Sequence, residues 1–284
     1  MTKAPSLELS QGPWTARIEL LGAQLRSLTH HGEELLWGGD SRWNKSAPLL
    51  FPVTGRLAED TLRFEGQSFA HPMHGLARES LFRLEQSSSQ EALLSLDHTG
   101  DARFPWDFRL EARYRLQKSG LELCLRVLNP SSHRTLPFQI GWHPGFAWGD
   151  GPWRLRWSAP SALTELEVVP GLGLRTGKEI PWDAMTEFVW KDRPTALVCR
   201  NLPGRTELWR DGHGLSVSYD PPPAAWVFWS LPNSPFLCPE GWHGLPDRTG
   251  FDGDFAERET MLTVPPKGSW ELCCRVQSLP EETT

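Results

Sequence analysis

Hydrophobic and polar residues alternate along several short segments of the chain. From Leu110 to Leu116 every second residue is apolar and each residue in between is charged. The stretch from Leu121 to Val127 repeats the alternation, with Glu, Cys and Arg at the intervening positions. Because successive side chains of an extended strand point to opposite faces, each segment predicts a half-buried strand. The short connection Gln117–Gly120 contains glycine and predicts that the two strands form a hairpin.

Similar runs recur from end to end, separated by segments rich in Gly, Pro and Asp, and the 3.6-residue helical period hardly occurs. The further predicted strands are Ala16–Leu21, Leu93–Asp97, Leu215–Tyr219, Ala225–Trp229 and Trp270–Val276. Many short strands without a helical block indicate antiparallel sheets packed face to face. We therefore expect an all-β protein, one large β-sandwich domain over residues 1–284. The segment Val169–Trp182, rich in Gly and Pro, is predicted to be a long surface loop beside a site.

Composition narrows the class of partner. Of the 284 residues, 39% are hydrophobic and 23% are charged, so a sizeable core can form. The net charge of -6, with interspersed Lys and Arg, argues against a nucleic-acid partner and favours a small molecule. The N-terminal segment lacks the apolar core of a signal peptide, and no stretch has the apolar length of a membrane span. We expect a cytoplasmic protein, a monomer or homodimer, that does not bind membranes.

The chain has five cysteines, an odd number, and no C-x-x-C spacing. This pattern favours reduced, buried thiols over a disulfide framework or a zinc site. The cysteines are Cys124, Cys199, Cys238, Cys273 and Cys274.

Tryptophan is unusually frequent, with 15 Trp against 2 Tyr. A Trp side chain offers an apolar face and one N–H donor, which suits stacking against the C–H face of a sugar ring. Most of these residues must nevertheless belong to the core, because packed sheets use aromatic residues heavily.

Three polar clusters interrupt the strand pattern, each where a β protein would present a loop. The first comprises Phe51–Arg56 and His71–Arg78, the second is Gly141–Phe146, and the third is Cys238–Asp247. Together they resemble the aldose 1-epimerase superfamily, and within it the branch of shorter bacterial proteins akin to LacX. That branch has Phe-Pro and Gly-Arg before a His-Gly-x-Ala-Arg motif, then Gly-x-His-Pro-x-Phe, and finally Glu-x-Trp-x-Gly running into an Asp. The likeness covers nearly the whole chain, with the motifs in the same order.

The resemblance implies a galactose mutarotase-like β supersandwich that interconverts the anomers of a cyclic aldose. By this match Glu240 corresponds to the general base and His143 to the general acid. His74 and Arg56 correspond to sugar-binding or polarising groups. The remaining candidates for substrate binding are Arg78, Trp242 and Asp192, the last for an aspartate that binds a sugar hydroxyl through a loosely matching motif.

The chemistry of ring opening asks for the same set. The anomeric hydroxyl loses a proton while the ring oxygen gains one, so we expect a base and an acid on opposite sides of the hemiacetal. One carboxylate and one imidazole suffice, and the reaction needs no cofactor or metal. His71 and His74, three residues apart, would not face the same way on a strand, and no third ligand follows at a familiar interval.

Each assignment has a structural alternative. His143 precedes a proline and could cap a turn, and an Arg could simply neutralise Glu240. Arg56 and Arg78 could form structural ion pairs, and Trp242 could be a stacking platform or a core residue.

The function also has alternatives. A phosphorylated sugar such as a hexose 6-phosphate could be the substrate, with Arg56, Arg78 or Lys45 binding the phosphate. The fold could instead serve as a sugar-binding module without catalysis. A glycoside hydrolase or lyase ranks last, because hydrolysis normally needs two facing carboxylates and only Glu240 lies in a recognised motif.

Overall fold

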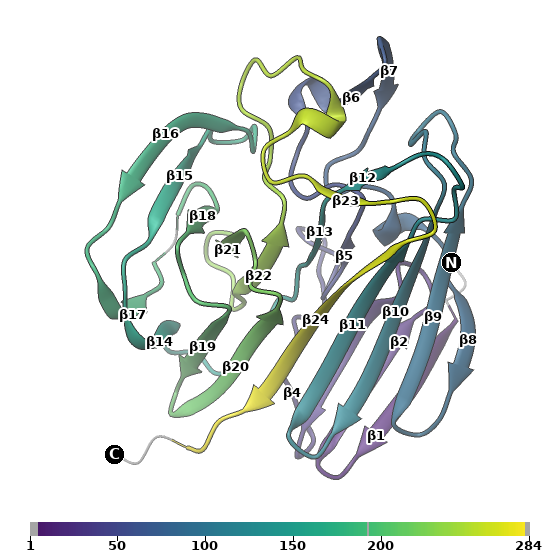
Figure 1. The fold of residues 1–284 in the computed structure, drawn as a ribbon. Helices are drawn as coiled ribbons and strands as arrows, with labels where there is room; N and C mark the ends of the chain where they lie inside the picture. Colours follow the sequence, from purple (N-terminus) through teal and green to yellow (C-terminus); the bar gives the residue numbers. More distant parts are fainter. Residues whose placement is uncertain (1–4, 192, 282–284) are drawn as a thin grey trace.

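The computed structural model describes residues 5–191 and 193–281, which form β-strands and three short 3-10 segments. The largest sheet has nine strands in the order β17-β14-β19-β20-β24-β11-β10-β9-β8 (Figure 1). Their bounds are β8 Arg83–Ser87, β9 Glu91–His98, β10 Phe108–Gln117, β11 Gly120–Leu128, β14 Arg154–Ser161, β17 Met185–Val189, β19 Arg205–Arg210, β20 His213–Asp220 and β24 Ser269–Ser278. Every pairing in it is antiparallel.

A second sheet has seven strands in the order β16-β15-β18-β21-β22-β13-β5. Its strands are β5 Leu49–Leu50, β13 Ile140–Trp142, β15 Thr164–Val168, β16 Arg175–Pro181, β18 Leu197–Arg200, β21 Ala225–Trp229 and β22 Cys238–His243. A four-stranded sheet combines β1 Ser6–Gln11, β2 Trp14–Glu19, β3 Gln24–His30 and β4 Glu33–Glu34.

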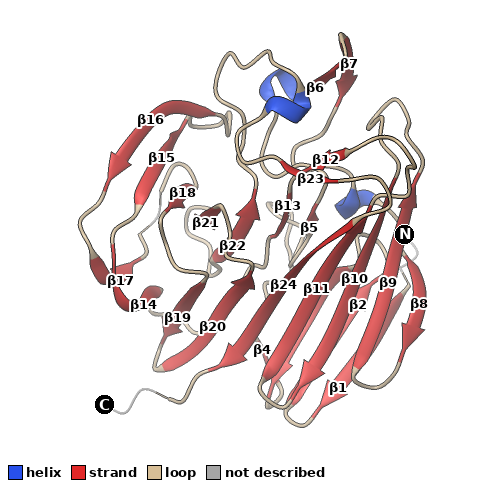
Figure 2. Cartoon of the chain, in the orientation of Figure 1, coloured by secondary structure: helices blue, strands red, loops and turns tan. Residues whose placement is uncertain are grey.

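The smaller elements are two strand pairs, β6 Thr61–Phe64 with β7 Gln67–Ala70 and β12 Leu136–Phe138 with β23 Leu262–Val264. The 3-10 segments are η1 Ala58–Asp60, η2 Ala77–Glu79 and η3 Phe255–Glu257. Strands therefore dominate the described chain (Figure 2), and the predicted all-β class with antiparallel sheets is confirmed. None of the described helices has the length and apolarity that a membrane crossing requires.

The predicted hairpin is β10 and β11. Leu110 pairs with Val127 and the last pair is Gln117 with Gly120, so only two residues remain in the turn. Alternate residues of both strands are buried, as the sequence pattern indicates. The polar face carries ion pairs such as Arg109 to Asp97 at 2.9 Å, while the buried face packs toward β1 and β2. Four of the other predicted strands are found within β9, β20, β21 and β24, and the fifth, Ala16–Leu21, overlaps β2, which ends two residues earlier at Glu19.

The central strands of the seven-stranded sheet are buried on both faces. Trp226 and Phe228 of β21 belong to the main core, whereas Val227, between them, faces the opposite side with Trp242 of β22. Behind β22, the ring of Tyr219 lies so close to Gly241 that a Cβ there would be 2.6 Å from it. One face of this sheet thus packs on the core and the other remains for a pocket.

The segment Val169–Trp182 is not one long loop, and that expectation is wrong in part. Residues 175–181 form strand β16, which pairs with β15, and only the turn between the two strands is irregular. The Val169 N–H donates to the Leu174 carbonyl at 2.9 Å and closes this turn. Gly and Pro lower strand propensity locally, but an edge strand tolerates them because one of its sides is unpaired.

The expectation that all five cysteines are reduced is also wrong. Cys124 of β11 and Cys273 of β24 lie directly opposite each other, with a Cα–Cα distance of 4.1 Å, and form a disulfide. Cys199, Cys238 and Cys274 are free and buried. The sequence separation of 149 between the bonded cysteines explains the error, because strand register rather than sequence spacing brings them together.

Candidate active site

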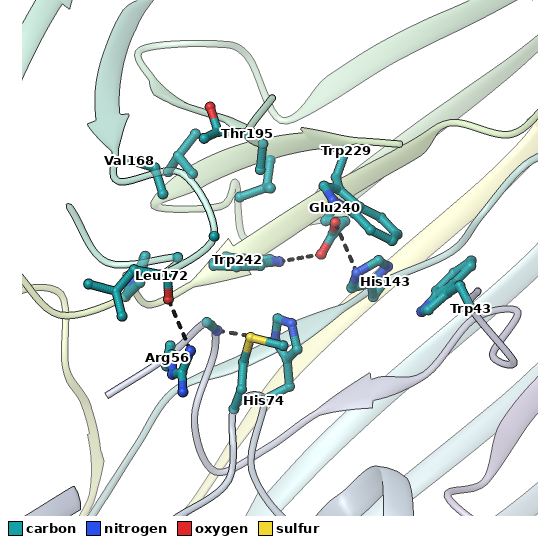
Figure 3. A pocket seen from close by; sticks show the side chains of 18 of the residues that line it. Trp43, Arg56, His74, His143, Val168, Leu172, Thr195, Trp229, Glu240 and Trp242 are labelled. Carbon is teal, nitrogen blue, oxygen red and sulfur yellow. Dashed lines mark hydrogen bonds and ion pairs between the residues drawn. The ribbon is translucent and has the colours of Figure 1, made fainter. Parts of the chain in front are cut away.

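A cavity of about 460 Å³ lies over the face of the seven-stranded sheet that carries Val227 and Trp242 (Figure 3). Strands β15, β18, β21 and β22 contribute residues to its lining. Loops bring the remainder, from the segments around residues 42–48, 55–56, 73–78, 143, 169–173, 194–196 and 231. All three polar clusters of the sequence therefore reach one pocket.

Glu240 and His143 meet in this pocket. Glu240 sits in the middle of β22, and His143 follows β13, which pairs with β22. The His143 Nε2 is 3.3 Å from the Glu240 Oε1, and the two side chains are 9% and 1% exposed. The Trp242 Nε1–H donates to the Glu240 Oε2 at 2.8 Å, because residues i and i+2 of a strand share a face. The indole thus orients the carboxylate toward His143 (Figure 3).

Burial sets the charge of this pair. It raises the pKa of Glu240 well above its ordinary value, although the Trp242 hydrogen bond acts in the opposite direction. Burial also lowers the pKa of His143 to about 3. Both shifts favour the uncharged form of each group, that is, one titratable proton on the pair, and the 3.3 Å contact lets this proton pass between Oε1 and Nε2. The arrangement can give a proton to one ligand atom and take one from another without a change in net charge.

His74 lies in a tight loop docked against the segment before η1. Its N–H donates to the Gly55 carbonyl at 2.8 Å, and the Gly55 N–H donates to the His74 Nδ1 at 3.2 Å. Burial, with smaller contributions from His143 and Arg78, lowers the pKa of His74 well below its ordinary value. The neutral ring accepts at Nδ1, so its proton is on Nε2. His74 is a fixed hydrogen-bond donor in the pocket wall.

Two tryptophans form an aromatic wall that the sequence reasoning missed as site residues. The ring centroids of Trp43 and Trp229 lie 5.2 Å and 5.4 Å from that of His143. Trp229 ends a strand that reads as core, and Trp43 lies in an irregular segment, so neither stands out among 15 tryptophans. The apolar wall and polar floor together suit a ligand with a hydrophobic face and several oxygens.

The two predicted arginines differ in their partners. Arg56 lines the pocket, but Asp60 binds its Nε and Nη2 at 2.7 Å and 2.6 Å, and its Nη1 donates to the Leu172 carbonyl at 3.4 Å. Arg78 has no hydrogen-bond partner for its buried Nε among the described residues, and burial lowers its pKa. Arg78 is thus the better placed of the two to bind a ligand acceptor.

The other candidates fall in different places. Trp242 is both a buried residue and part of the pocket wall. Lys45 does not line the pocket and bonds to Glu79 at 2.9 Å. His71 is buried elsewhere, with its Nδ1 at 2.9 Å from the Arg103 carbonyl oxygen. Asp192 lies outside the described residues.

Two pocket residues, His143 and Glu240, and the buried Cys238 together have the donors of a metal site. A ligand atom from each of His143, Cys238 and Glu240 lies within 4.8 Å of the other two. The second such set in the described chain includes Cys124 and Cys273, whose sulfurs are joined in the disulfide.

Comparisons with known proteins agree with the motifs. The sequence model of the aldose 1-epimerase family matches residues 5–264. Protein LacX of Lactococcus lactis subsp. lactis, in plasmid and chromosomal forms, is 27% identical over 275 residues, covering 84% of this chain and 88% of the relative.

Solved structures show the same fold. A galactose mutarotase-like protein from Lactobacillus casei ATCC 334 superposes with a TM-score of 0.89 at 22% identity, over 97% of this chain and 100% of the other. A galactose mutarotase related enzyme from Lactobacillus acidophilus gives 0.87 at 21% identity, over 98% of both chains. The fold is therefore that of the galactose mutarotase-like proteins, and the chain belongs to the aldose 1-epimerase family, in its LacX-like branch.

Proposed function

We propose that this protein is an aldose 1-epimerase that interconverts the α and β anomers of a hexose or a related free aldose. The observation that carries the proposal is the 3.3 Å contact between the His143 Nε2 and the Glu240 Oε1, in a pocket with an aromatic wall. Membership of the family supports an isomerase that binds sugars. A cytoplasmic location and a monomeric or homodimeric state remain predictions from the sequence.

The mechanism follows from proton balance. With the proton of the pair on His143, the Glu240 carboxylate takes the proton of the anomeric hydroxyl, the bond from C1 to the ring oxygen breaks, and the His143 imidazolium gives its proton to that oxygen. Rotation about the C1–C2 bond presents the other face of the aldehyde, and the reverse transfers close the ring. The pair holds one proton before and after each ring opening, so no outside acid or base is consumed.

The geometry changes one detail of the sequence-based mechanism. Glu240 and His143 are neighbours and do not stand on opposite sides of a ligand-sized gap. Adjacent groups fit the reaction because the anomeric oxygen and the ring oxygen are bonded to the same carbon. The Nε2–H of His74 then supports a sugar oxygen from the wall of the pocket.

Saturation-transfer NMR between the two anomers of a panel of aldoses tests the proposal. The wild type should accelerate exchange over buffer, and Glu240→Gln and His143→Asn should each lower kcat by about 10²- to 10⁴-fold. His71→Asn is the matched control, because His71 is buried but lies outside the pocket. Sugar binding without exchange in the wild type would identify a binding module and overturn the enzymatic proposal.

A hexose 6-phosphate is the second candidate substrate, favoured by the Arg78 Nε, which has no hydrogen-bond partner among the described residues and only a 3.9 Å contact with Glu79. Hydrogen bonds to charged groups contribute about 1.5–3 kcal/mol. Arg78→Met should therefore lower kcat/KM for the phosphate ester about tenfold or more while sparing the free hexose. Arg42→Met is the control, because Arg42 lines the same pocket but is paired with Asp40 at 2.7 Å. Equal effects of Arg78→Met on both sugars would exclude phosphate recognition by Arg78.

A further inference from the structure

We propose that a soft divalent cation, of which Zn²⁺ is the type, binds to Cys238, His143 and Glu240, where His143 and Glu240 line the pocket and Cys238 is buried beside them. These residues offer a sulfur, an imidazole nitrogen and a carboxylate oxygen, all within 4.8 Å of one another and all buried. The proposed epimerase reaction uses His143 and Glu240 and leaves the thiol without a role.

Rigid elements hold the three ligands. Cys238 and Glu240 are two residues apart on β22 and therefore share the face that looks toward the pocket. The loop that carries His143 is tied to the start of β22 by reciprocal backbone hydrogen bonds between Phe146 and Leu237, each 2.9 Å long. Sites built on strands keep their geometry better than sites on free loops.

The distance between the His143 and Glu240 ligand atoms suits a tetrahedral ion. Zn–N and Zn–O bonds of about 2.0–2.2 Å at tetrahedral angles leave the two ligand atoms about 3.3 Å apart. The His143 Nε2 and Glu240 Oε1 are 3.3 Å apart. The Trp242 Nε1–H holds the other carboxylate oxygen and leaves Oε1 toward His143, as outer-shell donors do at metal centres.

The donor set also selects the ion. Thiolate and imidazole suit Zn²⁺ and its softer relatives, whereas Mg²⁺ and Ca²⁺ prefer oxygen ligands throughout. The fourth position would open into the cavity, because His143 and Glu240 both line it. An ion held there occupies both members of the proton-transfer pair and should inhibit anomer exchange. That inhibition rests on the proposed function, whereas binding of the ion does not.

Cobalt absorption tests binding directly. The full chain, treated with a chelator and then titrated with Co²⁺, should show a thiolate-to-cobalt charge-transfer band that Zn²⁺ displaces. Cys238→Ser should lose the band and weaken Zn²⁺ binding by calorimetry at least about 10- to 100-fold, the loss that even outer-shell changes cause. Cys199→Ser is the matched control, because Cys199 is a free, buried strand cysteine that does not belong to this set of ligands, and the variant should keep the band.

A second variant, Glu240→Gln, should also weaken Zn²⁺ binding and so tests the site if the serine variant does not fold. A wild type without the band and without calorimetric binding would overturn the site, as would unchanged binding in Cys238→Ser. A band in a protein that does not exchange anomers would keep the metal site and remove the epimerase. Anomer exchange that is insensitive to Zn²⁺, in a protein without the band, would support the epimerase and exclude the metal site.

Discussion

Glu240 is the residue at which stability and function are in conflict. A carboxylate buried without a cationic side chain against it is costly to ionise, and the raised pKa of Glu240 expresses that cost. In the sequence, Glu240 lies in an apolar, glycine-rich segment, where a buried carboxylate is costly without a function or a partner. The Trp242 N–H that orients it, and the imidazole beside it, depend on the strand pairing.

Glu240→Gln should stabilise the folded protein. The folded-state pKa is raised above the ordinary value of 4.5, so the associated stability is present below pH 4.5 and is lost as the pH rises. Gln keeps the shape and carries no charge, so at pH 7.5 the free energy of unfolding should rise by about 1 kcal/mol or more. Urea unfolding measures the difference, which should vanish at pH 4. A variant less stable than wild type at pH 7.5 would contradict the burial argument.

The pH profile of kcat/KM should lack the inflection of an ordinary histidine. The pKa of His143 is lowered to about 3, so a second proton joins the pair only in strong acid, and the raised pKa of Glu240 favours retention of the first proton as the pH rises. After subtraction of the buffer rate, kcat/KM should stay level between pH 5 and pH 7, that is, across the ordinary histidine pKa of about 6.5. A loss of activity near pH 6.5 would show that the imidazole titrates by itself.

The loop that carries His74 shows how an element positions a side chain. His74 and Gly75 both have positive φ, 66° and 75°, and a Cβ added to Gly75 would lie 2.3 Å from the Phe51 carbonyl oxygen. The close approach lets the Leu76 N–H donate to that oxygen at 2.7 Å. The position of His74 therefore depends on a glycine that cannot take a side chain without moving the loop.

Gly75→Ala should displace His74 and cost more stability than strain in φ alone. Gly66→Ala is the matched control, because Gly66 has φ of 73° but nothing within 4 Å of an added Cβ. We expect the free energy of unfolding to fall by about 1–2 kcal/mol in the control and by more in Gly75→Ala. Only Gly75→Ala should also raise KM. Urea unfolding and NMR exchange kinetics measure the two effects. Equal losses of stability in both variants would show that the loop relaxes freely.

At the scale of the whole molecule, the disulfide joins strands that are distant in sequence. Cys124 and Cys273 connect the predicted hairpin to β24, which is the last strand along the chain and the neighbour of β11 in the nine-stranded sheet. The long loop that the bond closes restricts the unfolded chain, and such bonds typically contribute about 2–4 kcal/mol.

Reduction should therefore lower the free energy of unfolding by about 2–4 kcal/mol. Urea unfolding with and without dithiothreitol measures this, and the double variant Cys124→Ser/Cys273→Ser provides the control, since it should be insensitive to the reductant. Active protein should remain after reduction, because the disulfide is not part of the pocket lining. A midpoint unaffected by reductant in the wild type would show that these thiols are not joined in solution.

The sequence by itself determined the all-β class, the hairpin of β10 and β11 and the motifs that supply Glu240, His143 and His74, because alternation and motif order are local properties of the chain. Only the tertiary structure decided which distant residues meet. In the folded chain Cys124 is bonded to Cys273, and Arg56 forms an ion pair with Asp60. Glu240 lies beside His143, and Trp43 and Trp229 form part of the pocket wall. The physical reason is strand register, which depends on pairing between segments far apart in the chain and is not visible in the periodicity of either one.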